Sequence, residues 1–260
     1  MKRSLLMPDA LIDSDFGPAV AVQPAPKAAD ILVVCEHASR STPPSLGNLG
    51  LPDHLLTSHI AWDPGALGVA MALAKQLGAP LVHGLISRLV YDCNRPPEAA
   101  SAIPLRSETH DVPGNNDLTE AGRQERIQKV YHPFCEQMRR EIRQRKDRLR
   151  LLVTVHSFTP VFNGQHRSVE LGILHGQDDR FARAMLADTP QGTNRKVRLN
   201  EPYSATDGVA HTLDLHGAQN GLLSVMLEIR NDLIATEAAQ SAWADWLAPW
   251  MRKTLQEVAT

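Results

Sequence analysis

The sequence predicts an α/β protein, a three-layer sandwich in which helices cover both faces of a mostly parallel central sheet. Short apolar runs typical of buried strands alternate along the chain with helical segments that carry one apolar face. Two of these runs, residues 31–35 and 151–155, lead directly into His37 and His156 at their carboxyl ends. In open α/β sheets, that end of the strands is where ligands bind.

Composition and charge argue against several kinds of partner. Of the 260 residues, 43% are hydrophobic and 22% are charged, as in ordinary soluble domains. The net charge of -2 gives no indication of binding to nucleic acid or to an anionic membrane. The three cysteines, Cys35, Cys93 and Cys135, are widely spaced and predict neither a disulfide framework nor a cysteine zinc site, which suits a reducing cytosol.

The amino-terminal segment predicts no targeting signal. Its short apolar run ends at Pro8, too early for a signal peptide, and no stretch approaches the roughly 18 apolar residues of a membrane helix. We therefore expect a cytoplasmic protein. Residues 1–29 are rich in Ala, Pro and Asp, and we expect a poorly structured tail there, followed by a single domain at residues 30–260.

The first strand of that domain, residues 31–35, precedes a loop punctuated by proline and glycine. A helix then begins near residue 64, where Asp63 fits the N-cap and Pro64 the first helical position. Gly78 fits the carboxyl-terminal stop. The apolar face of this helix is expected to contain Leu67, Met71, Leu73 and Ala74.

The middle of the chain predicts a short strand at residues 80–83 and an extended segment at 87–96. Residues 96–118 are expected to be irregular, with a tight turn at 113–116. A long charged helix follows up to residue 149, with Thr119 near its start. Its apolar positions recur every three or four residues and cover one face of the core; they are Ile127, Val130, Phe134, Met138 and Ile142.

The last part of the chain continues the alternation of strands and helices. Four further strands are expected at residues 151–155, 169–174, 196–199 and 222–229. Helices are expected at residues 179–186 and 238–258, the latter packing its tryptophans against the sheet. No nucleotide-binding glycine fingerprint follows any of the strands.

Two strand-end histidines and a carboxylate predict a metal site. A hydrolytic zinc site needs three protein ligands and one position left open for water. His37 and His156 supply two ligands, and Asp63 and Glu36 compete for the third place. Glu36 is the immediate neighbour of His37, and adjacent residues of a strand point to opposite faces, which counts against it. The alternative for Asp63 is a simple N-cap.

Glu228 and four polar residues are the other candidates for chemistry. Glu228 follows an apolar strand, where a carboxylate is costly to bury unless it has a partner or a function, so we expect it to act as general base and acid. Its alternative is an ion pair with Arg230 or another arginine. The candidates for gripping a substrate carboxylate are Asn94, Arg95, Arg88 and Arg167.

Three alternatives remain open among these polar residues. Asp92 is suited to orienting either Arg95 or Arg88. Arg167 is either a second anion clamp or a surface charge. His132 lies on the long helix, where it either supports the site from behind or faces solvent.

At these residues the chain resembles the N-formylglutamate amidohydrolase family. The resemblance spans about residues 31–250, in the order of the family. It is carried by Cys35-Glu36-His37-Ala38, His59-Ile60-Ala61-Trp62-Asp63-Pro64-Gly65-Ala66, Ser87-Arg88-Leu89-Val90-Tyr91-Asp92-Cys93-Asn94-Arg95-Pro96, Val112-Pro113-Gly114-Asn115, His156-Ser157-Phe158-Thr159-Pro160, Asn200-Glu201-Pro202-Tyr203-Ser204 and Glu228-Ile229-Arg230-Asn231-Asp232-Leu233.

The resemblance implies a phosphorylase/hydrolase-like fold and a metal-dependent hydrolase, with zinc as the expected metal. The implied reaction converts N-formyl-L-glutamate to formate and glutamate in histidine breakdown. The order of His37, Asp63, His156 and Glu228 is also similar to that of zinc cell-wall amidases, which favours Asp63 over Glu36 as the ligand. The expected partner is a small anionic acylated amino acid. The alternatives are an amidase on another acyl-amino acid or cell-wall peptide, and a non-catalytic carboxylate-binding protein.

Overall fold

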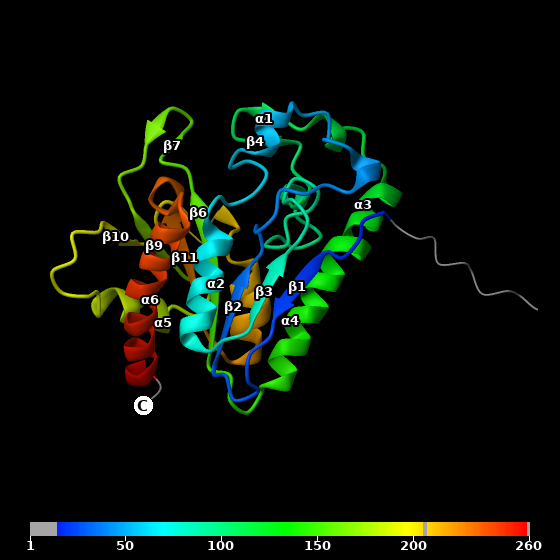
Figure 1. Cartoon of the computed structure of the whole chain (residues 1–260). Coiled ribbons are helices and arrows are strands. Elements are labelled where there is room, and N and C mark those ends of the chain that lie inside the picture. Colours follow the sequence, from blue (N-terminus) through cyan, green and yellow to red (C-terminus); the bar gives the residue numbers. More distant parts are fainter. Residues whose placement is uncertain (1–14, 205–206, 259–260) are drawn as a thin grey trace, which may run out of the picture.

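A seven-stranded sheet, mostly parallel, organises the computed structural model, which describes residues 15–204 and 207–258 (Figure 1). The strand order is β1-β3-β2-β6-β11-β9-β10. The strands are β1 (Val20–Gln23), β2 (Ile31–Cys35), β3 (Leu81–Gly84), β6 (Leu151–Phe158), β9 (Leu171–Leu174), β10 (Val197–Leu199) and β11 (Leu223–Arg230). Strands β3, β2, β6 and β11 run parallel, whereas β1 and β9 are antiparallel to their neighbours β3 and β11. The predicted α/β class is confirmed.

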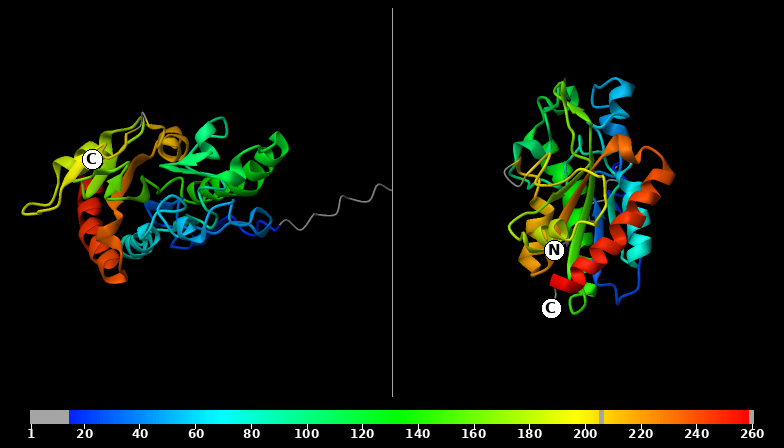
Figure 2. Two further views of the ribbon diagram at one scale, coloured as in Figure 1. Left: turned by 90° about the horizontal axis from the view of Figure 1, so that it is seen from above. Right: turned by 90° about the vertical axis from the view of Figure 1, so that its left-hand side faces the viewer.

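Helices cover both faces of this sheet. They are α1 (Asp53–Leu56), α2 (Ala66–Leu77), α3 (Glu120–Arg126), α4 (His132–Gln144), α5 (Arg180–Ala187) and α6 (Glu237–Val258). Figure 2 shows α2 and α6 together on one side of the sheet and α3 and α4 on the other. Shorter helical turns join these elements: η1 (Pro44–Leu46), η2 (Ala100–Ala102), η3 (Pro113–Asn115), η4 (Ile127–Tyr131), η6 (Leu213–Gly217), η7 (Ala218–Asn220) and η8 (Asn231–Ile234).

The central strands are apolar on both faces because each face packs against a layer of helices. In β2, Ile31 and Val33 pack in the core cluster that contains residues of α2, α5 and α6. The intervening Leu32 and Val34 pack in the cluster that contains residues of α4. The side-chain period of two therefore distributes a continuous apolar run between two cores.

The amino-terminal segment contributes an edge strand. Strand β1 pairs antiparallel with β3, and Phe16 and Ala19 before it are buried. The expectation of a poorly structured tail over residues 1–29 therefore does not hold for Val20–Gln23, because these residues gain ladder hydrogen bonds at an open sheet edge. Residues 1–14 lie outside the described part of the chain.

The expected extended segment at residues 87–96 is wrong, since these residues form successive turns. The amide of Val90 donates to the Ser87 carbonyl at 2.9 Å, and the amide of Arg95 donates to the Asp92 carbonyl at 3.0 Å. Ser87 also donates its hydroxyl to the Ala61 carbonyl at 2.7 Å. Two local side-chain bonds add to these turns: the Ser87 hydroxyl accepts from the Leu89 amide at 3.2 Å, and the Asp92 carboxylate accepts from the Asn94 amide at 2.9 Å. Serine and aspartate favour turns through such local bonds, and here they override the apolar run between them. Beyond it, β4 (Arg106–Ser107) and β5 (His110–Asp111) form a small hairpin.

The predicted long helix forms, and it is interrupted once. Thr119 caps α3 by accepting a hydrogen bond from the Gly122 amide at 3.1 Å. The π-helical turn η4 separates α3 from α4 and ends two residues before Pro133, which has no amide hydrogen to continue an α-helical ladder. The helix ends at Gln144 rather than at residue 149. Its five predicted apolar positions are all buried.

Helix α2 differs from its prediction at both Asp63 and Met71. The helix begins at Ala66 after an N-cap at Gly65, so Asp63 is not its cap. Met71 is 47% exposed and does not belong to the buried face. Gly78 ends the helix in the left-handed conformation, as predicted. Among the described helices, none combines the length and the apolar character that crossing a membrane would require.

Candidate active site

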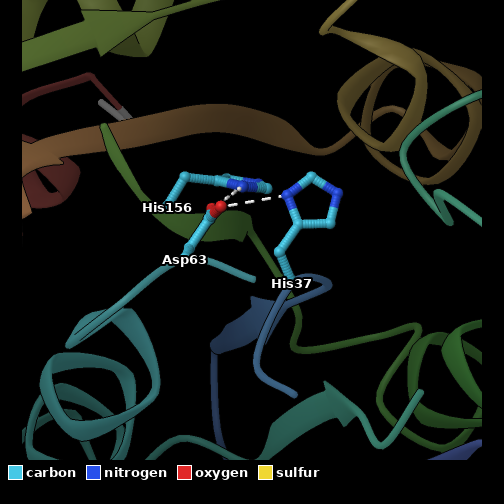
Figure 3. A group of neighbouring side chains, drawn as sticks. All are labelled: His37, Asp63 and His156. Carbon is cyan, nitrogen blue, oxygen red and sulfur yellow. Dashed lines mark hydrogen bonds and ion pairs between the residues drawn. The ribbon is translucent and has the colours of Figure 1, made fainter. Parts of the chain in front are cut away.

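Three buried side chains converge at the carboxyl end of the parallel strands. His37 follows β2, Asp63 precedes α2 and His156 lies within β6 (Figure 3). The Asp63 Oδ2 atom lies 3.3 Å from His37 Nδ1 and 2.9 Å from His156 Nδ1. One ligand atom from each residue lies within 4.8 Å of the others. The sequence named these three residues as metal ligands, and the fold brings them together; their binding of one ion stays a prediction.

The backbone around Asp63 fixes this geometry. Its amide donates to the His37 carbonyl at 2.9 Å, and its carboxylate accepts from the Ser157 amide at 3.3 Å. Gly65 then turns the chain into α2 with φ of 81°, and a Cβ atom there would lie 2.4 Å from the Ile234 carbonyl oxygen. Only glycine tolerates both the conformation and the close approach. The turn from the strand edge into α2 therefore delivers Asp63 to the two histidines instead of to the helix terminus.

The far side of each histidine faces another buried carboxylate. His37 Nε2 lies 2.7 Å from Asp92 Oδ1, and His156 Nε2 lies 3.1 Å from Glu36 Oε2. Arg88 bridges two of these acids, with contacts of 3.4 Å to Asp63 and 2.9 Å to Asp92. Glu36 is thus behind His156, and Asp63 is the carboxylate on the shared side of the two rings.

Burial and mutual contact shift the pKa values in this cluster. Burial alone raises the pKa of the Asp63 carboxyl, but His37 and His156 outweigh it and hold that pKa well below its ordinary value. The pKa of Asp92 is lowered in the same way by His37 and Arg88 against the effect of burial. Burial lowers the pKa of His156, yet Glu36 and Asp63 reverse this and raise it well above the ordinary value.

The donor set fits a divalent cation. Asp63, Asp92 and Glu36 are buried carboxylates whose pKa values are lowered, and Arg88 is the one guanidinium in contact with them among the described residues. The two histidines are the main source of the positive charge that lowers these pKa values, and a divalent ion bound between them would supply positive charge to the same acids. Two imidazole nitrogens and one carboxylate oxygen are the ligand types of open catalytic zinc sites.

Glu228 lies beside this cluster on β11. It pairs in register with His156 on β6, and it is 5% exposed. Its Oε2 atom has no hydrogen-bond partner within the described residues, and Arg230 pairs instead with Asp232 at 2.8 Å. The alternative of an ion pair with Arg230 is therefore wrong. Burial raises the pKa of Glu228 to about 7, with His156 opposing and Asp63 adding to the rise.

Glu228 and the cluster line one cavity of about 530 Å³. All four residues that the sequence named for substrate binding line it as well, although most of their polar groups are engaged. The Asn94 carboxamide donates to the Val209 carbonyl at 2.6 Å and accepts from the Thr212 amide at 2.9 Å. Arg88 contacts the two aspartates described above, and Arg95 donates to the Gly208 carbonyl.

Arg167 differs from the other arginines of the cavity. Its guanidinium carbon lies 5.7, 4.3 and 4.8 Å from the ring centroids of Phe158, Phe162 and Tyr203. It donates to the Tyr203 hydroxyl at 2.8 Å, and no carboxylate pairs with it in the described part of the chain. The alternative of a plain surface charge does not describe this aromatic setting. His132 does not line the cavity, and its ring lies 5.6 Å from that of Tyr131.

Two features of the site escaped sequence reasoning. Tyr203 was noted only within a motif, because nothing in a loop sequence predicts which cavity a tyrosine enters. Asp92 was expected to orient an arginine, and it does contact Arg88, but its contact with His37 spans 55 residues. No local pattern carries that information.

A family model and two solved structures resemble this chain. The sequence model described as N-formylglutamate amidohydrolase matches residues 29–235. A gene product of Agrobacterium tumefaciens of known crystal structure is 50% identical; the match covers 94% of this chain and 97% of that one, with a TM-score of 0.89. An N-formylglutamate amidohydrolase from Ralstonia eutropha JMP134 shares the fold at 15% identity and a TM-score of 0.61, covering 93% and 98% of the two chains. The search of curated protein sequences gives no significant match.

Proposed function

The chain belongs to the N-formylglutamate amidohydrolase family and is therefore a hydrolase of amide bonds, and we propose that it is a metal-dependent enzyme that releases the acyl group of an N-acylated amino acid. The substrate favoured by the family is N-formyl-L-glutamate, which gives formate and glutamate. The observation that supports this proposal most strongly is the register pairing of Glu228 with His156, which puts a buried carboxylate beside the cluster of His37, Asp63 and His156.

The proposed metal site consists of His37 Nδ1, Asp63 Oδ2 and His156 Nδ1. These residues would hold a divalent ion, with zinc the best match to the ligand types. When bound, such an ion acts as a Lewis acid toward a carbonyl oxygen and lowers the pKa of water. The cavity lets a substrate reach the cluster, since all three residues line it together with Glu228.

Glu228 is proposed to transfer the proton of the reaction. A carboxylate whose pKa lies near neutrality can accept a proton from water as the new carbon–oxygen bond forms. It can then return that proton to the leaving nitrogen as the carbon–nitrogen bond breaks. The atoms balance, since water supplies the hydroxyl of the released acid and the proton of the free amine. No other carboxylate that lines the cavity lies opposite His156 in the strand register.

The anion of the substrate is proposed to bind at Arg167, with Arg95 as a second contact. Arg167 has a fixed orientation between aromatic rings and no carboxylate partner in the described residues, so its planar fork is available for a substrate carboxylate. Because Arg167 donates to the Tyr203 oxygen, the phenolic hydrogen of Tyr203 remains free to donate to the same anion. Asn94 is proposed to hold the loop at Val209 through its hydrogen bond to that carbonyl. Arg88 is proposed to hold the Asp92 carboxylate in place.

One substrate screen tests the proposal. The purified enzyme is stripped of metal, reloaded with zinc and assayed for free amine released from N-formyl-, N-acetyl- and N-succinyl-glutamate and from N-formyl derivatives of uncharged amino acids. We expect metal-dependent turnover with a preference for the anionic N-formyl compound. Turnover of a different acyl group would identify another acyl-amino acid amidase. Tight binding without any turnover, with or without metal, would contradict the enzymatic proposal and favour a carboxylate-binding protein.

A further inference from the structure

Each proposed metal-binding histidine has a buried carboxylate on the side away from the shared centre. Asp92 lies 2.7 Å from His37 Nε2, and Glu36 lies 3.1 Å from His156 Nε2. The two carboxylate side chains are 4% and 0% exposed. They come from different segments of the chain, the loop after β3 and the residue after β2, and yet they occupy equivalent positions behind the two rings.

A carboxylate in this position decides which ring nitrogen carries the hydrogen. Neutral imidazole has one N–H donor and one acceptor nitrogen, and an ionised carboxylate can only accept. Asp63 Oδ2 is likewise only an acceptor, but a cation at the shared centre needs the lone pairs of both Nδ1 atoms. With such a cation, the hydrogen of each neutral ring would lie on Nε2 and be donated to Glu36 or Asp92. From this geometry, and resting on the metal site proposed above, we propose that Glu36 and Asp92 are positioning residues that hold His156 and His37 in the tautomer and orientation that bind the ion.

The two carboxylates differ in how the fold supports them. Asp92 accepts a hydrogen bond from the Asn94 amide at 2.9 Å and from Arg88 at 2.9 Å, in addition to its contact with His37. Glu36 lies beside His156 Nε2 and the Thr212 hydroxyl, and neither of its oxygens has a well-formed hydrogen bond within the described residues. Asp92 therefore has three partners, whereas the charge of Glu36 is stabilised mainly by His156.

This difference predicts different effects on the metal-free protein. Removing the charge of Glu36 weakens one contact, the one with His156. Removing the charge of Asp92 weakens two, with His37 and with Arg88. Both acids support a proposed metal ligand, but Asp92 contributes more to the stability of the metal-free fold.

The test compares Glu36→Gln, Asp92→Asn and a matched control. In Glu108→Gln, the altered carboxylate also faces a histidine in the same cavity, with His59 Nε2 at 2.8 Å, but it does not contact the cluster. For each protein, the Kd for zinc and for cobalt is measured by competition with a chromophoric chelator, and the Tm is measured without metal. Neither readout depends on turnover, so both can be obtained before any substrate is known.

We expect Glu36→Gln to weaken metal binding by roughly 10–100-fold, the usual effect of losing such a partner, and to lower the metal-free Tm less than Asp92→Asn does. Asp92→Asn should weaken binding to a similar degree and lower the Tm as well. Glu108→Gln should leave the Kd unchanged.

Three outcomes would overturn the inference. The first is an unchanged Kd in Glu36→Gln when the wild type binds the ion tightly, and the second is an equal loss in Glu108→Gln. The third is a metal-free Tm that falls in Glu36→Gln as far as in Asp92→Asn, which would make Glu36 an ordinary structural acid. A wild-type protein that binds neither ion would remove the proposed metal site together with this inference, a result distinct from the first three.

Discussion

Glu228 on β11 and His156 on β6 are register partners, so they lie directly opposite one another on neighbouring parallel strands. Side chains of register partners in a parallel pair project to the same face of the sheet. Each strand is fully buried at these positions, which gives both residues a rigid support. The relationship between a proposed metal ligand and a proposed proton carrier is thus set by the ladder of the sheet itself.

Replacing Glu228 by Gln tests this relationship most directly. The variant keeps the shape of the side chain and cannot carry a proton, so we expect kcat to fall by roughly 10²–10⁴. The zinc content and the Tm should stay close to the wild-type values, because no cationic side chain forms an ion pair with Glu228 among the described residues. A variant that is stable and fully active would exclude a role for Glu228 in catalysis.

The shared carboxylate is tested by Asp63→Asn. Zinc added to the metal-free wild type should raise its stability by about 2.7 kcal/mol at a concentration 100-fold above the Kd. In the variant, the Oδ2 charge that faces both Nδ1 atoms is lost, so the zinc-induced rise in Tm should disappear. Thermal unfolding with and without zinc measures the effect. A zinc response of wild-type size in the variant would mean that the ion binds elsewhere.

Arg167 and Arg95 are expected to contribute unequally to binding of the substrate carboxylate. Arg167→Lys keeps the charge and loses the planar fork, so kcat/KM on an anionic substrate should fall roughly 30-fold. This corresponds to a loss of about 2 kcal/mol in transition-state stabilisation. Arg95→Lys should have a smaller effect, because Arg95 already donates to the Gly208 carbonyl. Kinetics on N-formylglutamate and on an uncharged N-formyl amide measure the difference.

Tyr203→Phe isolates the phenolic hydroxyl of the proposed anion site. It removes the acceptor of Arg167 and keeps the ring, so KM for the anionic substrate should rise with little change in kcat. Tyr131→Phe is the matched control, since the hydroxyl of Tyr131 contacts His211 at 2.9 Å and the residue does not line the cavity. Equal effects of the two substitutions would assign the loss to packing instead of anion binding.

His216 is expected to limit stability in acid. Burial lowers the pKa of this histidine to about 4, and the nearby charges of Arg139 and His211 add to the shift. A group with a lowered pKa contributes stability that is present above its unfolded value of about 6.5 and is lost as the pH falls toward the folded value. The full contribution is on the order of 3 kcal/mol from a shift of 6.5 to about 4.

Urea unfolding between pH 7 and pH 4 measures this contribution. The free energy of unfolding of His216→Gln should fall less steeply across this range than that of the wild type. His54→Gln, which alters an exposed histidine, should follow the wild-type slope. Parallel curves for all three proteins would show that His216 does not titrate differently in the folded state.

Much of the fold follows from local sequence. The apolar runs in β2, β6 and β11 predicted buried parallel strands because only strands covered on both faces are apolar at successive positions. The periodic apolar residues of α3 and α4 likewise predicted a helix against one face of the core. In residues 87–96 the same approach failed, since local hydrogen bonds accepted by the serine and aspartate side chains turned a segment whose composition resembled a strand.

The sequence also identified the principal residues of the candidate site. His37, His156 and Glu228 stand at or near the carboxyl ends of predicted strands, and parallel strands share that edge, so their proximity could be expected before the fold was known. The choice between Asp63 and Glu36 could not be made from position alone. The structure favours Asp63 for the proposed site, because the turn at Gly65 brings it to the Nδ1 side of both rings, while Glu36 lies at the far nitrogen of His156.

Only the tertiary structure decided which polar groups are free to act. Asn94 and Arg88 matched the chemistry of an anion clamp as well as Arg167 did, since the sequence states what a side chain can bind and not what it already contacts. In the fold, residues more than 100 positions away satisfy the Asn94 carboxamide, whereas three aromatic rings surround Arg167 and leave its charge available. Hydrogen-bond capacity is a property of the residue, but its use depends on neighbours that long-range packing supplies.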